Sequence, residues 1–403
     1  MASVRPVISP VIGAIAESAT LALSAKASAM KAAGEDVIAF AAGEPDFDTP
    51  EFIKDAAVKA LKAGKTKYAP VAGTAELRQA IAEKLKKENG LDYDASEIVV
   101  SCGAKHSLFN AILTLVSDGD EVLIPAPYWV TYPEQVRVAR GVPVYVETLA
   151  KDGFKLRPEA VKKAVKKGKT KLLILNSPNN PTGAVYDAET LGAIADILVA
   201  NDVYVLSDEI YEKLLYGRRK HVSIFGLREG MKERGILVNG FSKAFSMTGW
   251  RVGYTAAPKQ FTVPMSRLQS HSTSGIATFV MPAATAALKS DQSDVAKMLA
   301  AFELRRNLIV RRARAIPLLE CTEPEGAFYL MVGIARLIGK SVAGRKIVSA
   351  SDFCMGLLET KKVAAVSGED FGAPEWVRFS YACSESDINR GFDRIAEFVK
   401  SVK

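Results

Sequence analysis

The feature that most constrains the fold is a regular alternation of short apolar runs and longer helix-like segments between residues 97 and 257. Each run has the length of a strand, and the segments between runs are long enough for helices. Residues 171–176 have an entirely apolar middle, typical of a strand covered on both faces of a parallel sheet. The alternation predicts an α/β domain with a mostly parallel sheet. The runs interpreted as its strands are residues 97–102, 121–124, 142–146, 171–176, 203–207, 236–238 and 250–257.

Residues suited to ligand contact follow the ends of several of these runs. Cys102, Pro125, Asn176 and Asp208 stand at or just beyond the carboxyl ends of four of them. In open α/β sheets, ligands bind in the crevice outside the carboxyl ends of the strands. We therefore expect a ligand site at this edge of the sheet.

The bulk properties narrow the class of protein. A length of 403 residues is enough for two domains with a sizeable core. No apolar run approaches the roughly 20 residues of a membrane span. Pro10, Glu17 and Ser18 interrupt the apolar stretch 7–23, which argues against a signal peptide. The four cysteines form no CxxC pair, which favours reduced thiols in a cytoplasmic protein over a disulfide framework or a metal site.

The net charge is +8, and lysines cluster at two places. Nucleic-acid-binding surfaces combine a basic face with aromatic residues. Neither cluster contains aromatics, so we interpret both as solvated faces and exclude nucleic acid as a partner. A further basic stretch, residues 217–221, is a loop to which we assign no role. The two clusters are Lys162, Lys163, Lys166, Lys167, Lys169 and Lys171, and Lys84, Lys86 and Lys87.

The most informative stretch is residues 239–251, which begins where an apolar run ends. Lys243 lies there among small and hydroxyl residues, with Phe241 and Phe245 on either side. Partial burial disfavours the ammonium form of a lysine and frees an amine nucleophile. Arg251 adds a fixed cation nearby, and an amine beside an anion clamp suits pyridoxal 5′-phosphate (PLP), which carries an aldehyde and a phosphate. Taken alone, Lys243 could equally be an ordinary loop lysine.

A second anion-binding element follows the run 97–102. Gly103, Ala104 and Lys105 form a tight turn at the start of a helix-like segment, where free N–H groups and the helix dipole attract anions. A cation at that end of a helix is unfavourable, which favours a functional reason for Lys105 over a surface lysine. Together with Arg251, this turn would form a phosphate cup.

These motifs and several others give the chain a resemblance to the class I aminotransferases of the aspartate aminotransferase fold family, from about residue 41 to residue 381. The chain is most similar to the bacterial and plant branch that includes aspartate and aspartate/prephenate aminotransferases. The other motifs are the Gly/Pro-rich loop 41–50, Asn180-Pro-Thr-Gly183, Asp208-Glu-Ile-Tyr211, Ser242-Lys243 with Arg251, and Trp376-Val-Arg-Phe-Ser-Tyr381.

The resemblance implies an α/β protein of the PLP-dependent transferase fold type I. It implies a large PLP-binding domain, residues 45–290, with a mostly parallel seven-stranded sheet. Residues 1–44 and 291–403 would form a smaller α/β domain.

By this resemblance, Lys243 is the catalytic residue that binds the PLP aldehyde and then removes the α-proton of the substrate. Asp208 would pair with the pyridine nitrogen, which suits a carboxylate at a buried strand end better than a helix N-cap role does. Trp129 and Tyr68 could otherwise be core aromatics. The implied cofactor contacts are Gly103, Ala104, Lys105 and Arg251 in the phosphate region, Ser242 beside Lys243, Trp129 on the ring, Asn180 and Tyr211 at the phenolic oxygen, and Tyr68 from a neighbouring chain of a homodimer.

The resemblance also implies the substrate contacts. Arg378 would grip the α-carboxylate, and its planar fork suits that role, although a pair with an internal carboxylate is the alternative. Lys105, helped by a hydroxyl of Ser18 or Thr20, would bind a side-chain carboxylate. The substrate-binding residues expected are Gly43, Lys105, Trp129, Asn180, Arg378 and Thr20.

The expected function is a PLP-dependent aminotransferase that exchanges an amino group between L-aspartate or glutamate and a 2-oxo acid such as 2-oxoglutarate. Prephenate is a further candidate substrate. The alternatives are an aromatic (tyrosine/phenylalanine) aminotransferase and a PLP-dependent C–S lyase. A PLP-binding regulator is disfavoured, because the chain has no room for the DNA-binding domain that such regulators usually carry.

Overall fold

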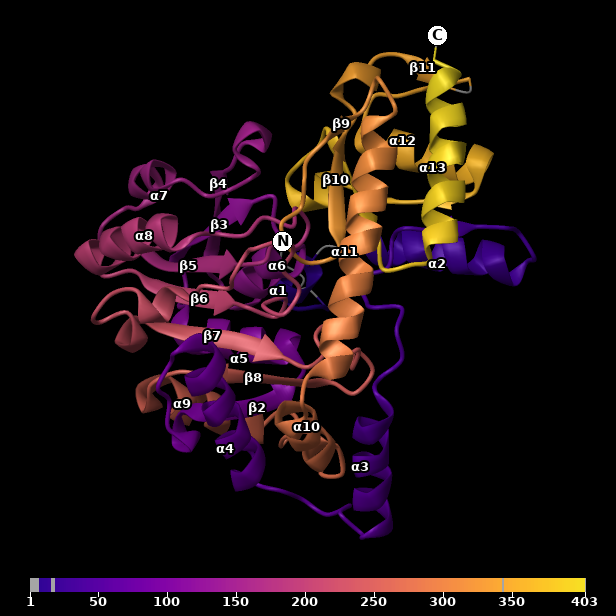
Figure 1. The fold of residues 1–403 in the computed structure, drawn as a ribbon. Helices are drawn as coiled ribbons and strands as arrows, with labels where there is room; N and C mark the ends of the chain where they lie inside the picture. The colour runs from indigo at the N-terminus through magenta and orange to yellow at the C-terminus, as the bar shows by residue number, and fades with distance from the viewer. Residues whose placement is uncertain (1–6, 16–18, 343, 403) are drawn as a thin grey trace.

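A computed structural model describes residues 7–15, 19–342 and 344–402. Its centre is a seven-stranded sheet in the order β2-β8-β7-β6-β5-β3-β4 (Figure 1). Neighbouring strands run parallel from β7 to β4, whereas β8 is antiparallel to both β2 and β7. The expected mostly parallel sheet is confirmed. Its strands are β2 (Ile98–Cys102), β3 (Glu121–Ala126), β4 (Val142–Glu147), β5 (Thr170–Asn176), β6 (Tyr204–Asp208), β7 (Gly235–Gly240) and β8 (Val252–Ala256).

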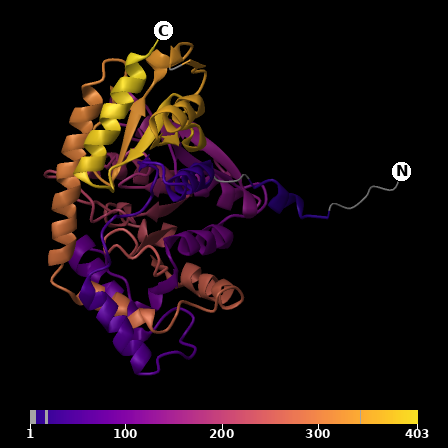
Figure 2. The ribbon, with the colours of Figure 1, turned by 90° about the vertical axis from the view of Figure 1, so that its right-hand side faces the viewer.

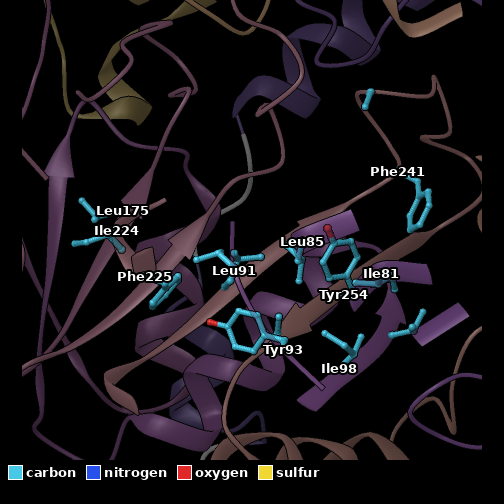
Figure 3. Packing of buried hydrophobic residues seen from close by; sticks show 14 of the residues in the cluster. Ile81, Leu85, Leu91, Tyr93, Ile98, Leu175, Ile224, Phe225, Phe241 and Tyr254 are labelled. Carbon is cyan, nitrogen blue, oxygen red and sulfur yellow. The ribbon is translucent and has the colours of Figure 1, made fainter. Parts of the chain in front are cut away.

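Helices cover both faces of this sheet. On β5, Leu172 and Ile174 join one hydrophobic cluster, whereas Leu173 and Leu175 join another. Because successive side chains of a strand point to opposite faces, the apolar middle of β5 reflects cover on both sides. Figure 3 shows part of the cluster that contains Leu175. One face carries α5 (Ala104–Leu115), α6 (Thr131–Val138) and α9 (Lys259–Ser270); the other carries α3 (Glu51–Lys62), α4 (Ala75–Lys84), α7 (Pro158–Ala164), α8 (Ala188–Asn201) and α10 (Val280–Lys289).

A second sheet of four antiparallel strands has the order β14-β15-β10-β9. The long helix α11 leads from the first sheet to the second, and α13 runs beside it (Figures 1 and 2). The N-terminal β1 pairs with β13 of this region. The elements are α1 (Pro10–Gly13), α2 (Ala19–Ala32), β1 (Ile38–Ala39), α11 (Ser293–Arg314), β9 (Glu320–Cys321), β10 (Tyr329–Gly333), β11 (Ser341–Val342), β12 (Arg345–Lys346), α12 (Ala350–Lys361), β13 (Val363–Ala364), β14 (Val366–Ser367), β15 (Trp376–Ser380) and α13 (Glu385–Lys400).

The domain boundaries, with residues 45–290 in one domain and residues 1–44 and 291–403 in the other, stay a prediction. The apolar run 363–366 forms two short strands, because β13 pairs with β1 while β14 pairs with β15. Across residues 7–15, 19–342 and 344–402, every helix is too short or too polar to pass through a bilayer.

One lysine expected on a solvated face is buried instead. Lys84 is only 8% exposed, and its ammonium forms an ion pair with the buried carboxylate of Glu212. Its Nζ also donates to Asn89 Oδ1 at 2.8 Å. The solvated-face interpretation is therefore wrong for Lys84, because Glu212 comes from a distant segment and its countercharge makes burial of the ammonium tolerable. Lys86 and Lys87 are exposed, as expected.

Candidate active site

A cavity of about 970 Å³ lies at the carboxyl edge of the large sheet. Asn176 at the end of β5 and Asp208 at the end of β6 line it, and Arg378 reaches it from β15 of the second sheet. The site thus lies where the two sheets meet. The predicted residues that line the cavity are Gly43, Ala104, Lys105, Trp129, Asn180, Asp208, Tyr211, Ser242, Lys243, Arg251 and Arg378.

Lys243 lies in the turn between β7 and β8, and its Nζ donates a hydrogen bond to the carbonyl oxygen of Gly43 at 2.6 Å. Burial lowers the pKa of the Lys243 amine to about 8. The carboxylate of Glu44 opposes this pKa shift, whereas the cations of Arg251 and Arg378 add to it. About a tenth of the amine is therefore unprotonated, and nucleophilic, at pH 7, and about half at pH 8.

Asp208 is 3% exposed, and such burial disfavours the charged form of its carboxyl. Burial raises the pKa of its carboxyl to about 6, although hydrogen bonds from the Tyr132 hydroxyl and the Ile210 N–H act in the opposite direction. The Tyr132 hydroxyl donates to Asp208 Oδ2 at 2.7 Å. A carboxylate held in this way is ready to accept a cationic partner from the cavity.

Tyr132 is a residue of this site that the sequence reasoning missed. Its ring meets the ring of Trp129 edge to face, with centroids 5.4 Å apart. The spacing of three residues from Trp129, at the start of α6, could have shown that both rings lie on one side.

Arg378 is fully enclosed by the protein and oriented by two acceptors. Its Nη1 donates to Asn180 Oδ1 at 3.0 Å, and its Nη2 donates to the carbonyl oxygen of Ala41 at 3.1 Å. The guanidinium also lies 4.5 Å from the ring centroid of Tyr329. The Tyr329 hydroxyl shares a 2.9 Å hydrogen bond with that of Tyr211, so these residues form one connected wall. No carboxylate pairs with Arg378 among the described residues, which leaves its charge available to an anionic ligand.

The turn between β2 and α5 is tightly fitted against Arg251. Gly103 has a φ of +83°, and a Cβ added there would lie 2.5 Å from Arg251 Nη2. Gly253 is equally constrained, because its Cβ would lie 2.2 Å from the backbone nitrogen of Ala104. Arg251 Nη1 donates to the carbonyl oxygen of Thr248 at 2.7 Å, which fixes the guanidinium beside the start of α5. Backbone N–H groups at a helix start and an adjacent cation make an anion site.

Lys105 follows this turn and lies on the cavity wall. Its Nζ is 4.8 Å from the ring centroid of Trp129. Burial lowers the pKa of Lys105, and the neighbouring charge of Arg251 lowers it further. The expectation of a cation beside the pocket therefore agrees with the geometry.

The remaining predicted site residues are Gly103, in the turn described above, Tyr68 and Thr20. The side chain of Tyr68 is 97% exposed, which leaves it free to contact another chain but not its own cavity. Thr20 lies in α2, but its side chain is outside the described residues, and so is the whole of Ser18. The roles expected for Tyr68, Thr20 and Ser18 stay predictions.

Comparisons with known proteins agree with this geometry. The family described as "Aminotransferase class I and II" matches residues 35–395. The chain is 47% identical to an aspartate aminotransferase of Geobacillus stearothermophilus, over 97% of this chain and 98% of that protein. It is 48% identical to a probable aspartate/prephenate aminotransferase of Aquifex aeolicus, over 96% of each. The crystal structure of the aspartate aminotransferase from Rhizobium meliloti superposes with a TM-score of 0.95 at 40% identity, covering 98% of this chain and 99% of that one.

Proposed function

The chain belongs to the class I and II aminotransferase family, and from this we propose that it exchanges an amino group between L-aspartate or L-glutamate and a 2-oxo acid such as 2-oxoglutarate, with PLP as its cofactor. The observation that carries this proposal is the partly buried amine of Lys243, in one cavity with Asp208, Arg251 and Arg378. The names of relatives that the chain matches over nearly its whole length support aspartate as a substrate.

The residues present fit each part of PLP. The N-terminus of α5 and Arg251 offer an anion site for its phosphate. Because Gly103 has no Cβ, the backbone there can approach Arg251 closely and border that site. The carboxyl of Asp208 suits the protonated ring nitrogen, because a buried acid needs a cationic partner in order to ionise. Trp129 offers a flat face for the ring. The remaining contacts proposed are Gly103, Ala104, Lys105 and Ser242 near the phosphate, and Asn180 and Tyr211 at the phenolic oxygen.

When bound, PLP supplies an aldehyde that reacts with amines and a ring that stabilises negative charge at the α-carbon of an amino acid. The chain supplies the proton transfers. With a pKa of about 8, Lys243 Nζ can accept the α-proton of the substrate and return it during one turnover. Asp208, once paired, keeps its carboxylate charged and so keeps the facing nitrogen protonated.

We assign the substrate carboxylates to two cations that line the same cavity as Lys243. The fork of Arg378, oriented by Asn180, suits the α-carboxylate, and the backbone at Gly43 borders the same place. Lys105 suits the side-chain carboxylate of aspartate or glutamate, with Thr20 as a hydroxyl partner. Trp129 completes the substrate side of the cavity.

We further propose that the enzyme is a homodimer in which Tyr68 reaches the phosphate site of the neighbouring chain. The support is that Tyr68 is a large aromatic residue whose side chain is almost completely exposed in the single chain. Exposed aromatic side chains of this kind are common at interfaces between chains.

An amino-donor and oxo-acceptor screen on PLP-loaded protein tests the substrate proposal. We expect fast exchange between aspartate and 2-oxoglutarate. Prephenate belongs in the screen because a relative of 48% identity carries the name aspartate/prephenate aminotransferase. Exchange confined to tyrosine and phenylalanine would contradict the choice of substrate, and release of ammonia and pyruvate without amino transfer would identify a lyase.

A further inference from the structure

The basic loop 217–221, for which the sequence indicates no role, ends at a histidine that is almost enclosed next to the end of β6. The side chain of His221 is 10% exposed, and its Nε2 lies 2.7 Å from Oε2 of Glu209. Glu209 is 1% exposed and is the residue that follows Asp208 at the end of β6. Because successive side chains of an extended chain point in opposite directions, Glu209 faces away from the cavity that Asp208 faces.

Both carboxylate oxygens of Glu209 have hydrogen-bond partners on the side of the strand away from the cavity. Its Oε1 accepts hydrogen bonds from the hydroxyls of Ser207 at 2.9 Å and Ser223 at 2.7 Å. Its backbone N–H donates to the carbonyl oxygen of Val238 on β7 at 2.8 Å. Ser207 belongs to β6, whereas His221 ends the loop and Ser223 lies two residues beyond it, so this one side chain joins the loop to the strand end.

A second buried carboxylate, Glu212, closes the same turn. It forms an ion pair with Lys84 of α4, and its Oε2 accepts from Asn89 Nδ2 at 2.7 Å. Its backbone N–H donates to the carbonyl oxygen of Glu209 at 2.9 Å. The turn from residue 208 to residue 212 is thus tied at both ends on the side away from the cavity.

The charges of this cluster balance only when His221 is an imidazolium. Glu209 and Glu212 carry two negative charges, and Lys84 supplies one positive charge; Glu88, 3.7 Å from Lys84, is balanced by Lys213 at 2.7 Å. Burial disfavours a charge on His221, but Glu209, and more weakly Glu212, raise its pKa above the usual value despite an opposing effect of Lys84. An isolated carboxylate in this environment would be strongly destabilising without that fourth group.

We propose that Glu209 and His221 are positioning residues whose buried pair fixes the turn after β6 from behind, so that Asp208 and Tyr211 keep their orientation toward the cavity. This inference rests on the proposed function. Asp208 and Tyr211 lie one and two residues from Glu209 along the chain, and neither has a direct contact with His221 among the bonds described. The pair therefore acts on the reaction without touching the cavity, by holding Asp208 and Tyr211 in place and by balancing the charge of Glu209 beside Asp208.

Three variants test the role of the pair, with PLP-loaded protein and aspartate as donor. His221→Gln keeps a donor toward Glu209 but removes the positive charge, Glu209→Gln removes the negative charge, and the double variant leaves a neutral pair. The matched control is Glu121→Gln, because Glu121 is also a buried carboxylate with lysine partners but lies at the opposite end of the sheet, at the start of β3.

We expect His221→Gln to lower kcat at least fivefold while KM for aspartate changes less than twofold, because the carboxylate-binding arginine is untouched. The pH midpoint of the change in the bound cofactor's absorption should rise by at least 0.5 pH unit, because Glu209 then carries an unbalanced negative charge beside Asp208. The double variant, whose charges are balanced again, should return both values at least halfway to those of the wild type. Glu121→Gln should lower thermal stability without moving either value.

The inference is overturned if folded Glu209→Gln, His221→Gln and double variants all keep kcat and the midpoint within the range of Glu121→Gln. Should His221→Gln fail to fold, Glu209→Gln gives the comparison, because it leaves the charge of His221 unbalanced and should lower both kcat and the midpoint relative to the double variant. Failure of the proposed function is a different result: wild-type protein would then show neither a bound-cofactor absorption band nor exchange from aspartate.

Discussion

At the scale of single residues, burial shifts the pKa values of Lys243 and Asp208 toward neutral pH. It lowers the pKa of Lys243 to about 8 and raises that of Asp208 to about 6. At pH 8 about half of Lys243 is then free amine, on the order of 100-fold more than for an unperturbed lysine. Groups that titrate near the working pH are the most effective in proton transfer.

Tyr132 is expected to hold Asp208 in its charged form. The folded carboxyl ionises near pH 6 and the unfolded one near 3.8, so the stability of the cofactor-free protein falls as the pH rises between these values. Tyr132→Phe removes the bond to Oδ2 and raises the Asp208 pKa further. We expect a loss of about 1–3 kcal/mol in the free energy of unfolding at pH 8 and a smaller loss at pH 5, measured by urea unfolding.

Tyr204→Phe is the control for this substitution, because Tyr204 lies at the other end of β6. An equal loss of stability from Tyr132→Phe at both pH values would show that the hydroxyl does not act on the ionised carboxylate.

Lys105 is expected to distinguish acidic from uncharged substrates. Lys105→Ala should lower kcat/KM for aspartate by roughly 10- to 100-fold. This range corresponds to the loss of about 1.5–3 kcal/mol, the contribution of a hydrogen bond to a charged group. The same variant should change kcat/KM for L-alanine less than threefold, since that substrate has no side-chain carboxylate. Steady-state kinetics with both donors measure this, with the exposed Lys162→Ala as control. Equal losses for the two donors would refute the assignment.

At the scale of elements, the turn from β2 into α5 leaves little room for change at Gly103. Gly103→Ala puts a Cβ 2.5 Å from Arg251 Nη2, in addition to the strain of φ +83°. We expect the dissociation constant of PLP, measured by absorbance titration, to rise at least tenfold. Gly119→Ala separates the two effects, because Gly119 has nearly the same φ, +82°, with nothing within 4 Å of the added Cβ. Similar PLP affinities for the two variants would mean that the close fit of Gly103 against Arg251 is not needed for PLP binding.

The sequence predicts the elements better than the long-range contacts behind them. The strands of the large sheet follow from apolar runs, and the side chains at their ends follow from parallel topology. Lys84 was misinterpreted, and His221 received no role, because each depends on a carboxylate from the segment 209–212 that no local pattern connects to it. A helical or loop lysine is normally solvated, and only tertiary contacts can reverse that expectation.

At the scale of the whole molecule, residues from both sheets line the cavity, and we propose that Tyr68 of a second chain completes it. If Tyr68 acts on the neighbouring site, a hybrid dimer of one Tyr68→Ala chain and one Lys243→Ala chain contains one site with both native residues. We expect purified hybrids to have about half of wild-type activity, since each contains one intact site of two. Differently tagged chains that are co-expressed and purified through both tags provide the measurement. Purified hybrids without activity would show that Tyr68 does not act across an interface.

The central claim is that Lys243 is the amine that holds PLP and moves the α-proton. The most direct measurement is to load the protein with PLP, reduce it with borohydride, and locate the labelled lysine by peptide mass spectrometry. We predict the label on Lys243, its absence in Lys243→Ala, and a loss of turnover in that variant of about a thousandfold or more. A label on another lysine, or turnover of Lys243→Ala within tenfold of the wild type, would contradict the account.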